Sequence, residues 1–483
     1  MSGAEMRDRH LVVGWWKELL LLTALSCLVL LPGLGQMHHL SSREARHAEI
    51  IREMSESGDF FVPTLLGKEY YDKPPVFHAV GAVLTRWSGA PSMTTARLPS
   101  ALAGWLAVLA TYGVGRILMN RTTAFVGAIA LLGMPGFYGM ARNARPDMML
   151  CAAIVLSGFC LMLGMREKRP QMRALAFALG GAFAGVGTLA KGPWGFVFPV
   201  LLALMVWFAR RDWKLPRVGW GLFAICLLGV VAAWAIPVYL RDGGRYLSQM
   251  LHQSDLQVGE ADWDPLSRYL VNGLVLTLPM SLFLPLAVRR WWRQGYSPLL
   301  AFALAVLVIF MLIPKKRPHY VLPMYPFLAL GIAEAVIQEA AQKKWLRNMA
   351  TITIGLSVIG VSLYYAFVQL FWHPPEDPDF EVARRLVAEM MPNSRVYVLA
   401  MQGREESLAW IGHRKIQVIR LDGDRGNAMT TLQNAPAGSY LATSLPQRQV
   451  LESAGVAPRL RLLTEASDIK SKFLLFRISE LGD

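Results

Sequence analysis

Six short polar clusters interrupt an otherwise apolar chain, and they hold the side chains that could carry out chemistry. Their carboxylates could accept a proton from a reacting group, and their lysine and arginine side chains could hold an anionic group such as a phosphate. The clusters are Arg43-Glu44 with Arg46, Asp72-Lys73-Pro74-Pro75, Arg142 to Asp147, Lys191-Gly192-Pro193, Asp262-Trp263-Asp264-Pro265 and Lys315 to Tyr320.

The composition of the chain indicates a polytopic membrane protein. Of its 483 residues 54% are hydrophobic and 17% are charged, whereas about a quarter of the residues of a soluble domain are charged. Runs such as Leu19–Leu34 and Val218–Ile236 approach or reach the ~20 residues that a helix needs to cross a bilayer. The first run is read as a retained signal anchor, because no small-residue cleavage pattern follows it.

The formal net charge of +15 is explained by membrane topology, and nucleic acid is not an expected partner. Lysine and arginine lie mostly in short links between apolar runs, where they set the orientation of the spans. The four cysteines all lie inside apolar runs, so the sequence supports neither a disulfide framework nor a cysteine-based metal site.

Counting the crossings places all six clusters on one side of the membrane. Eleven spans are predicted, at 15–36, 95–118, 122–141, 148–165, 174–190, 193–209, 218–238, 271–288, 297–313, 320–338 and 348–371. Every second link between them is basic, and basic links stay in the cytoplasm, so the clusters lie outside. This parity requires that Pro74–Trp87 does not cross, and we interpret it as an interfacial helix in a long first external loop, 37–94. That loop also contains Ser42–Ser55, where apolar residues recur at helical spacing.

Four of the six external clusters contain carboxylates. Asp262 and Asp264 lie two residues apart and could hold a divalent cation through hard oxygen ligands. The alternative is an ordinary solvated acidic loop, and oxygen-ligand spacing does not decide between the two. Arg46 and Asp147 are further polar residues of the same face.

Cations on the outer side break the positive-inside pattern. An anionic lipid headgroup held at the outer hydrocarbon boundary would require such charges, and arginine offers two donors to phosphate oxygens. The alternative is general binding to lipid phosphates. The candidate cations are Lys73, Arg142, Arg145, Lys191, Lys315, Lys316 and Arg317, with His319 and Tyr320 as polar lining.

The chain after the last span reads as a soluble domain. A linker rich in proline begins at His373, and strand-like runs follow at Arg395–Ala400, Ile416–Leu421, Ser439–Thr443 and Lys472–Ile478, with a helical stretch at Phe380–Met391. We therefore divide the chain into a membrane domain, 1–372, and a small α/β domain, 373–483, on the outer face. The expected fold class is a mainly α, polytopic membrane protein with about 11 to 13 transmembrane helices.

The loop motifs resemble those of a known family, the type C glycosyltransferases that use a polyprenyl phosphate carrier. This family includes aminoarabinose transferases and protein O-mannosyltransferases. The motifs that carry the resemblance cover about 290 residues in order, at Arg43–Ile50, Gly58–Pro63, Tyr71–Pro75, Ala144–Asp147, Leu189–Pro193 and Pro318–Pro326. The resemblance implies transfer of a sugar from a polyprenyl phosphate on the periplasmic face of a bacterial inner membrane to a lipid (lipid A), glycan or protein acceptor.

The resemblance also implies roles for single residues. The family's first loop usually carries an Asp-Glu pair, and here Arg43 replaces the aspartate, so Glu44 is the surviving candidate base, with Asp72 second. Asp72 matches a position associated with a bound metal, and Lys73 matches a donor-phosphate contact. Asp262 falls near the position where members of the family have a histidine that binds the metal. The resemblance therefore implies either a divalent cation (Mg, Mn or Zn) as cofactor or none.

A transporter or flippase of an anionic lipid-linked sugar is the rival function. It would require the same outer cations, and also ionisable residues near the bilayer midplane. The predicted spans contain almost none there.

Overall fold

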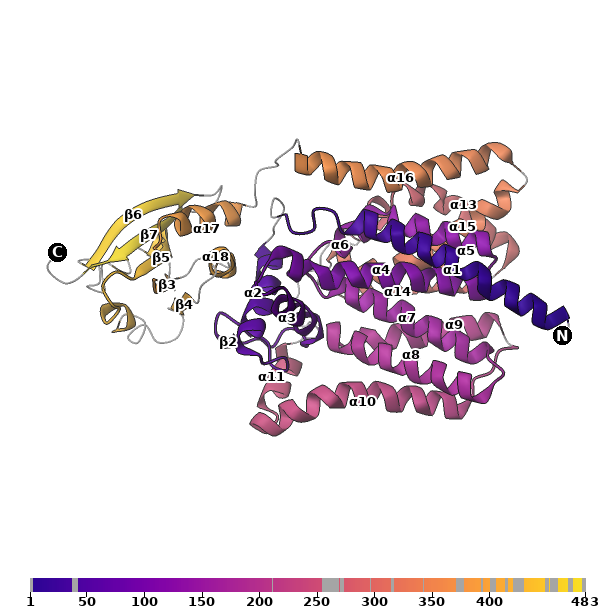
Figure 1. Ribbon diagram of the computed structural model, residues 1–483, viewed down its shortest axis with the longest axis horizontal. Coiled ribbons are helices and arrows are strands. Elements are labelled where there is room, and N and C mark those ends of the chain that lie inside the picture. The colour runs from indigo at the N-terminus through magenta and orange to yellow at the C-terminus, as the bar shows by residue number, and fades with distance from the viewer. Residues whose placement is uncertain are drawn as a thin grey trace. The chain divides into compact units, whose positions relative to one another are not determined.

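The computed structural model consists mainly of helices in the membrane domain and of a mixed sheet with helices in the tail (Figure 1). The structure describes residues 3–479 except 37–41, 211, 254–268, 270–272, 296, 314–316, 342, 371–377, 392–393, 400–404, 413–415, 420–429, 448–450, 452–458 and 468–471. The described residues form two compact units. Unit 1 contains 1–34, 71–81 and 97–367, and unit 2 contains 35–70, 82–96 and 368–483. The domain boundary at 372/373 stays a prediction.

Apolar helices form unit 1. They are α1 (Gly3–Leu30), the longer part of α4 (Met93–Leu118), α5 (Arg121–Leu132), α6 (Pro135–Ala141), α7 (Asp147–Arg166), α8 (Pro170–Lys191), α9 (Trp194–Ala209), α10 (Arg217–Asp242), α11 (Arg245–Gln253), α13 (Leu284–Gln294), α14 (Pro298–Met311), α15 (Tyr325–Ala340) and most of α16 (Lys344–Leu370), with the 3-10 helices η1 (Met280–Phe283) and η2 (Pro318–Met324). Among the described residues, six helices are long and apolar enough to cross a membrane, or up to eight if each bent pair forms one span. The chain is thus a multi-pass membrane protein, as predicted, and the exact number of spans stays a prediction.

Close backbone approach holds α8 against α10. A Cβ atom added at Gly181 of α8 would lie 2.1 Å from the carbonyl oxygen of Phe223 on α10. Small residues at helix interfaces allow this approach in membranes, where packing between helices replaces the hydrophobic effect. Since α8 also packs on α7, its C-terminal end at Lys191 is fixed beside the start of α7.

The span predicted at 122–141 is not one straight helix. It consists of α5 and α6, which meet at an angle of 67°. Pro135 has no backbone N–H to continue the ladder, and the N–H of Gly136 donates instead to the carbonyl of Leu276, at 2.8 Å. The described part of the span predicted at 271–288 is also interrupted, at Pro279, which is the N-cap of η1. The segment formed by η1 and α13 makes an angle of 116° with α14.

Two helices were predicted in the first external loop. One lies wholly in unit 2 and the other lies in it in part. Helix α2 (Ser42–Ser57) covers the predicted stretch Ser42–Ser55. Helix α3 (Val76–Ser88) begins two residues after Pro74 and is shared between the two units. A short hairpin of β1 (Thr64–Leu65) and β2 (Lys68–Glu69) lies between them in sequence.

The tail contains a five-stranded mixed sheet in the order β4-β3-β5-β7-β6. The strands are β3 (Val396–Leu399), β4 (Ile416–Ile419), β5 (Tyr440–Ser444), β6 (Leu460–Ser467) and β7 (Lys472–Ile478), with the helices α17 (Pro378–Ala388), α18 (Glu405–Gly412) and η3 (Leu445–Gln447). Strand β3 pairs in parallel with β4 and β5, and β7 pairs antiparallel with β5 and β6. Alternate strand residues, such as Val398 and Leu399, belong to two separate hydrophobic cores, so both faces of the sheet are covered.

Candidate active site

An ion pair between Asp147 and Lys191 forms the centre of the polar site in unit 1. Lys191 Nζ donates a hydrogen bond to Asp147 Oδ1, and the two side chains are only 10% and 6% exposed. Asp147 begins α7 and Lys191 ends α8, so each charge complements the partial charge of its own helix end. The short motifs around these two residues therefore meet in space. The predicted location of all six clusters on one side of the membrane is consistent with this contact.

The short helix η2 brings His319 and Tyr320 to this ion pair. His319 Nε2 lies 3.7 Å from Asp147 Oδ1, and Lys191 Nζ lies 4.4 Å from the centre of the Tyr320 ring. The Tyr320 ring also contacts Phe310 of α14, with ring centres 5.6 Å apart. Tyr320 is thus held by packing, and its ring face is available to a cation.

Two arginines add positive charge to the same site. The Arg317 guanidinium carbon lies 6.0 Å from the centre of the Tyr320 ring, and the backbone N–H of Arg317 donates to Tyr269 Oη at 3.1 Å. Arg145 is close enough to act electrostatically on Asp147 and His319. Its Nε atom is buried and has no hydrogen-bond partner among the residues that the structure describes.

Among the described residues, positive charges outnumber negative charges at this site. Three cations, Arg145, Lys191 and Arg317, act electrostatically on His319, and Asp147 is the one carboxylate among the described groups that act on this ring. A buried guanidinium N–H without an acceptor costs free energy, so the site is suited to an anionic ligand that supplies oxygen atoms. A phosphate group is such a ligand.

Arg142 binds backbone carbonyls in the described structure. Its guanidinium donates to the carbonyl oxygens of Leu30 and Pro32, both at 2.6 Å, and its side chain is buried. Leu30 ends α1 and Pro32 lies two residues after it, where the last turn of a helix leaves acceptors without partners. The contacts are those of a helix cap, and the phosphate contact expected of Arg142 stays a prediction.

Asp72 and Lys73 form a second ion pair of unit 1, just before α3. Lys73 Nζ lies 3.0 Å from Asp72 Oδ1, and the lysine is 12% exposed while the aspartate is 42% exposed. His78, fully buried on the first turn of α3, lies close enough to interact electrostatically with the Asp72 carboxylate. Burial lowers the pKa of His78 to about 3, and the Asp72 carboxylate opposes this shift in part.

The sequence reasoning missed Arg245, which contacts the residue before Asp72. Arg245 Nη1 donates to Tyr71 Oη at 3.3 Å, and the Tyr71 and Tyr246 rings are 5.1 Å apart. Arg245 follows a span that ends on the predicted outer side, so the criterion that selected the other outer cations could have found it.

Glu44 and Arg46 lie in unit 2, on the first turns of α2. Glu44 is 1% exposed. Arg46 Nη2 lies 3.0 Å from Glu406 Oε1 on α18. The roles predicted for Glu44 as a base and for Arg46 as a site residue stay predictions.

The predicted metal site falls partly outside the described residues, as does part of the predicted phosphate site. Asp262, Asp264, Lys315 and Lys316 are not among the residues that the structure describes. Within the described chain, no three histidine, cysteine, aspartate or glutamate side chains gather as metal ligands would. Asp72, the one described candidate, is paired with the Lys73 ammonium, so the described residues alone do not form a metal site. The predicted metal stays a prediction, and we derive no step through one.

Comparison with known proteins supports the resemblance seen in the loop motifs. Residues 72–235 match a family model described as dolichyl-phosphate-mannose-protein mannosyltransferase. A curated undecaprenyl phosphate-alpha-4-amino-4-deoxy-L-arabinose arabinosyl transferase from Pseudomonas paraeruginosa is 28% identical over 70% of this chain, and one from Aeromonas salmonicida is 29% identical over 64%. The chain spans 63% and 58% of the length of these two relatives.

Solved structures with the same fold were also found. ArnT from Cupriavidus metallidurans bound to undecaprenyl phosphate matches with a TM-score of 0.79 at 19% identity, over 96% of this chain and 98% of that one. The Archaeoglobus fulgidus oligosaccharyltransferase matches with a TM-score of 0.57 at 13% identity, over 91% of this chain and 70% of that one. Residues 72–235 thus match the protein mannosyltransferase family model, and the chain has the fold of ArnT, in agreement with the resemblance of the loop motifs.

Proposed function

We propose that this protein is a membrane glycosyltransferase that moves a sugar from a polyprenyl phosphate donor to an acceptor on the periplasmic face of a bacterial inner membrane. The observation that carries the proposal is the excess of cations around Asp147, with a buried Arg145 Nε that has no acceptor among the described residues. The acceptor is a hydroxyl or phosphate of a lipid such as lipid A, of a glycan or of a protein. The curated relatives are named as transferases of aminoarabinose from undecaprenyl phosphate, which supports a lipid-linked sugar as the donor.

The donor phosphate is the leaving group, so the site must stabilise the negative charge that develops on it. Arg145, Lys191 and Arg317 are positioned to do so, and their fixed geometry avoids reorganisation during the reaction. Asp147 holds the Lys191 ammonium in place, and the Tyr320 ring packs beneath it. Lys73, paired with Asp72, supplies a further cation before α3.

The bond between the anomeric carbon and the phosphate oxygen breaks, and the bond from the acceptor oxygen to that carbon forms. A carboxylate takes the proton from an acceptor hydroxyl, with Glu44 as the first candidate and Asp72 as the second. An acceptor phosphate that is already anionic needs no base, and the carboxylate then orients it. The tail, 373–483, is proposed to be a small α/β domain on the same face.

The test is transfer of labelled sugar from a polyprenyl phosphate donor in membranes that contain the full chain. Loss of a general base lowers rates by about 10²- to 10⁴-fold, so we expect Glu44→Gln or Asp72→Asn to reduce kcat on that scale. Lys73→Ala should raise KM for the donor. Rates unchanged in all three variants would remove this site.

The rival function, a flippase of a lipid-linked sugar, is separated by the product of the same assay. A transferase moves the label from the donor to an acceptor, whereas a flippase changes the leaflet in which the intact donor is found. Label that stays on the donor but becomes accessible from the other face would establish the rival function.

A further inference from the structure

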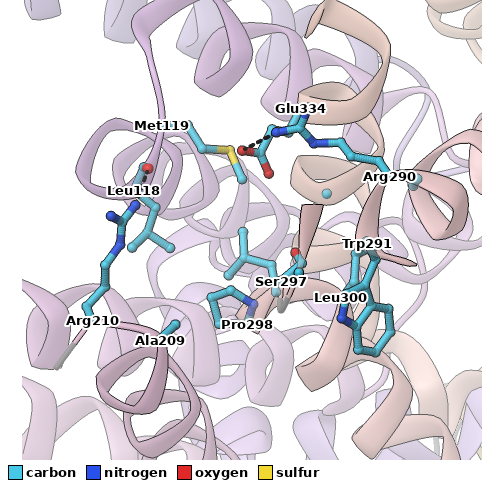
Figure 2. A pocket seen from close by; sticks show the side chains of 14 residues that line it. Leu118, Met119, Ala209, Arg210, Arg290, Trp291, Ser297, Pro298, Leu300 and Glu334 are labelled. Atoms are coloured by element: carbon cyan, nitrogen blue, oxygen red, sulfur yellow. Dashed lines mark hydrogen bonds and ion pairs between the residues drawn. The ribbon is translucent and has the colours of Figure 1, made fainter. Parts of the chain in front are cut away.

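A pocket of about 290 Å³ lies where the C-terminal parts of α4, α9 and α13 meet the start of α14 and the middle of α15 (Figure 2). Its volume is at the lower end of the roughly 300–1,000 Å³ of ligand pockets, so it suits a headgroup rather than a large cofactor. It is separate from the proposed active site. Helix α9 begins at Trp194, three residues after Lys191, and its 16 residues end at the pocket, which is about 24 Å along the helix axis.

The pocket wall carries two guanidinium groups and one carboxylate. Arg290 Nη2 lies 3.7 Å from Glu334 Oε1, and these side chains are 23% and 28% exposed. Figure 2 shows Arg210 on the other side of the pocket, where its Nη2 donates a long hydrogen bond of 3.5 Å to the carbonyl of Leu118. Each contact engages one guanidinium nitrogen, and a guanidinium has five N–H donors, so both arginines can also bind a ligand.

The rest of the lining is mostly apolar, and the pocket lies next to an amphipathic helix. Trp291 and Leu300 contribute apolar wall. On α13 the neighbouring Trp292 is 90% exposed and is flanked by exposed arginines. Exposed tryptophan with arginine on a short amphipathic helix is typical of the membrane–water interface.

We propose that this pocket binds the headgroup of a phospholipid that carries both a phosphate and a primary ammonium, as phosphatidylethanolamine does. Arg210 and Arg290 bind the phosphate oxygens, and Glu334 accepts a hydrogen bond from the ammonium. A purely anionic headgroup would meet the Glu334 carboxylate, and a choline headgroup has no N–H to donate. The apolar wall accommodates the glycerol and the first acyl carbons. The lipid would thus occupy the leaflet opposite to the proposed donor site.

The experiment uses the purified full chain in detergent with phosphatidylethanolamine, phosphatidylcholine and phosphatidylglycerol of identical acyl chains, and quantifies each bound lipid by native mass spectrometry. We expect phosphatidylethanolamine to bind best to the unmodified protein. Loss of charge-assisted hydrogen bonds should lower its binding about tenfold in Arg210→Gln/Arg290→Gln. Glu334→Gln should remove the preference over phosphatidylcholine and leave phosphate binding in place.

The matched control is Arg289→Gln/Arg293→Gln, which removes two exposed cations of α13 that do not line the pocket. Equal loss in this control, or no loss in the Arg210 and Arg290 variant, would overturn the proposal, because general surface charge would then explain the binding. Equal binding of phosphatidylglycerol by the unmodified protein would also overturn it. Displacement of the lipid by excess inorganic phosphate would identify a site for soluble phosphate instead.

A second variant covers the case in which the double arginine variant does not fold. Ser297 lines the pocket as the N-cap of α14, and among the described residues its side chain makes no capping hydrogen bond. Ser297→Trp fills the pocket and keeps every charge. It should exclude phosphatidylethanolamine while the thermal unfolding temperature stays near that of the unmodified protein, and retained binding would contradict the proposed site.

Discussion

Arg46 on α2 and Glu406 on α18 form an ion pair across 360 positions of sequence, with Arg46 Nη2 and Glu406 Oε1 3.0 Å apart. The arginine is 40% exposed, whereas the glutamate is 8% exposed. Burial raises the pKa of Glu406, and the Arg46 charge opposes that shift only in part. The pair therefore connects the first external loop to the tail within unit 2, and its two members contribute unequally to stability.

We expect Arg46→Gln to destabilise the packing of α18 on α2, while Glu406→Gln stays close to the unmodified protein. Removing the arginine leaves a buried carboxylate without its cation, which costs about 1–3 kcal/mol. Replacing the glutamate removes the charge that burial disfavours, and the cost is at most about 1 kcal/mol. Hydrogen exchange of the α18 amides in the full chain measures both free energies.

The control for this pair is Glu381→Gln, because Glu381 and Arg385 form an exposed ion pair on α17. An exposed pair contributes at most about 0.5 kcal/mol, so little change is expected. The Arg46→Gln cost should shrink as the pH falls through the pKa of Glu406, since a protonated carboxyl needs no cation. A larger cost in Glu406→Gln than in Arg46→Gln would contradict the assigned asymmetry.

Arg145→Gln should weaken donor binding without unfolding the protein. Its guanidinium contacts the donor phosphate in our proposal, so KM for the polyprenyl phosphate sugar should rise about tenfold or more. Arg169→Gln is the matched control, because Arg169 is 76% exposed and lies at the N-cap of α8, beyond the other end of α7. Steady-state transfer kinetics measure both variants, and an Arg145→Gln enzyme with unchanged donor KM would exclude Arg145 from the phosphate site.

A chelator tests the metal predicted at Asp72, Asp262 and Asp264. We expect EDTA to leave transfer unchanged, because the Asp72 carboxylate is already neutralised by Lys73 at 3.0 Å. The measurement is the rate before and after chelation, followed by addition of Mg²⁺, Mn²⁺ or Zn²⁺. A rate that is lost and then restored by one of these ions would establish a metal requirement and reverse this expectation.

Hydropathy and loop charge predicted the positions of most membrane helices, and the motifs predicted which loops meet. Asp147, Lys191 and His319 come together because each motif lies at the end of a span, and span ends of equal parity share a face. Local periodicity was also sufficient for α2 and for four of the five tail strands. Strand β6 was missed because a register shift between Leu462 and Thr464 interrupts its alternation.

Contacts that depend on tertiary structure could not be predicted from the sequence. Arg142 is positioned by free carbonyls at the end of α1, about a hundred residues earlier, and no motif records that pairing. The bend between α5 and α6 depends on a hydrogen bond from Gly136 to Leu276 as well as on Pro135. The partner of Arg46 lies in a tail helix whose packing on α2 has no signal in the spacing of either segment.

The buried histidine on α3 should make the protein acid-sensitive. Burial lowers the pKa of His78 to about 3, so above pH ~6.5 the ring is neutral in both the folded and the unfolded chain and contributes no pH dependence. Below that pH the unfolded chain binds a proton that the folded chain excludes, and stability falls as the pH falls towards 3. At pH ~5 this loss amounts to about 2 kcal/mol.

The free energy of unfolding of the full chain, measured at pH 7 and at pH 5, should therefore differ less in His78→Gln than in the unmodified protein, whatever the absolute stability of the variant. His252→Gln, which replaces an exposed histidine outside α3, is the matched control and should keep the full difference. If His78→Gln and His252→Gln have the same pH dependence, the ring of His78 is protonated in the folded chain and α3 does not exclude the charge.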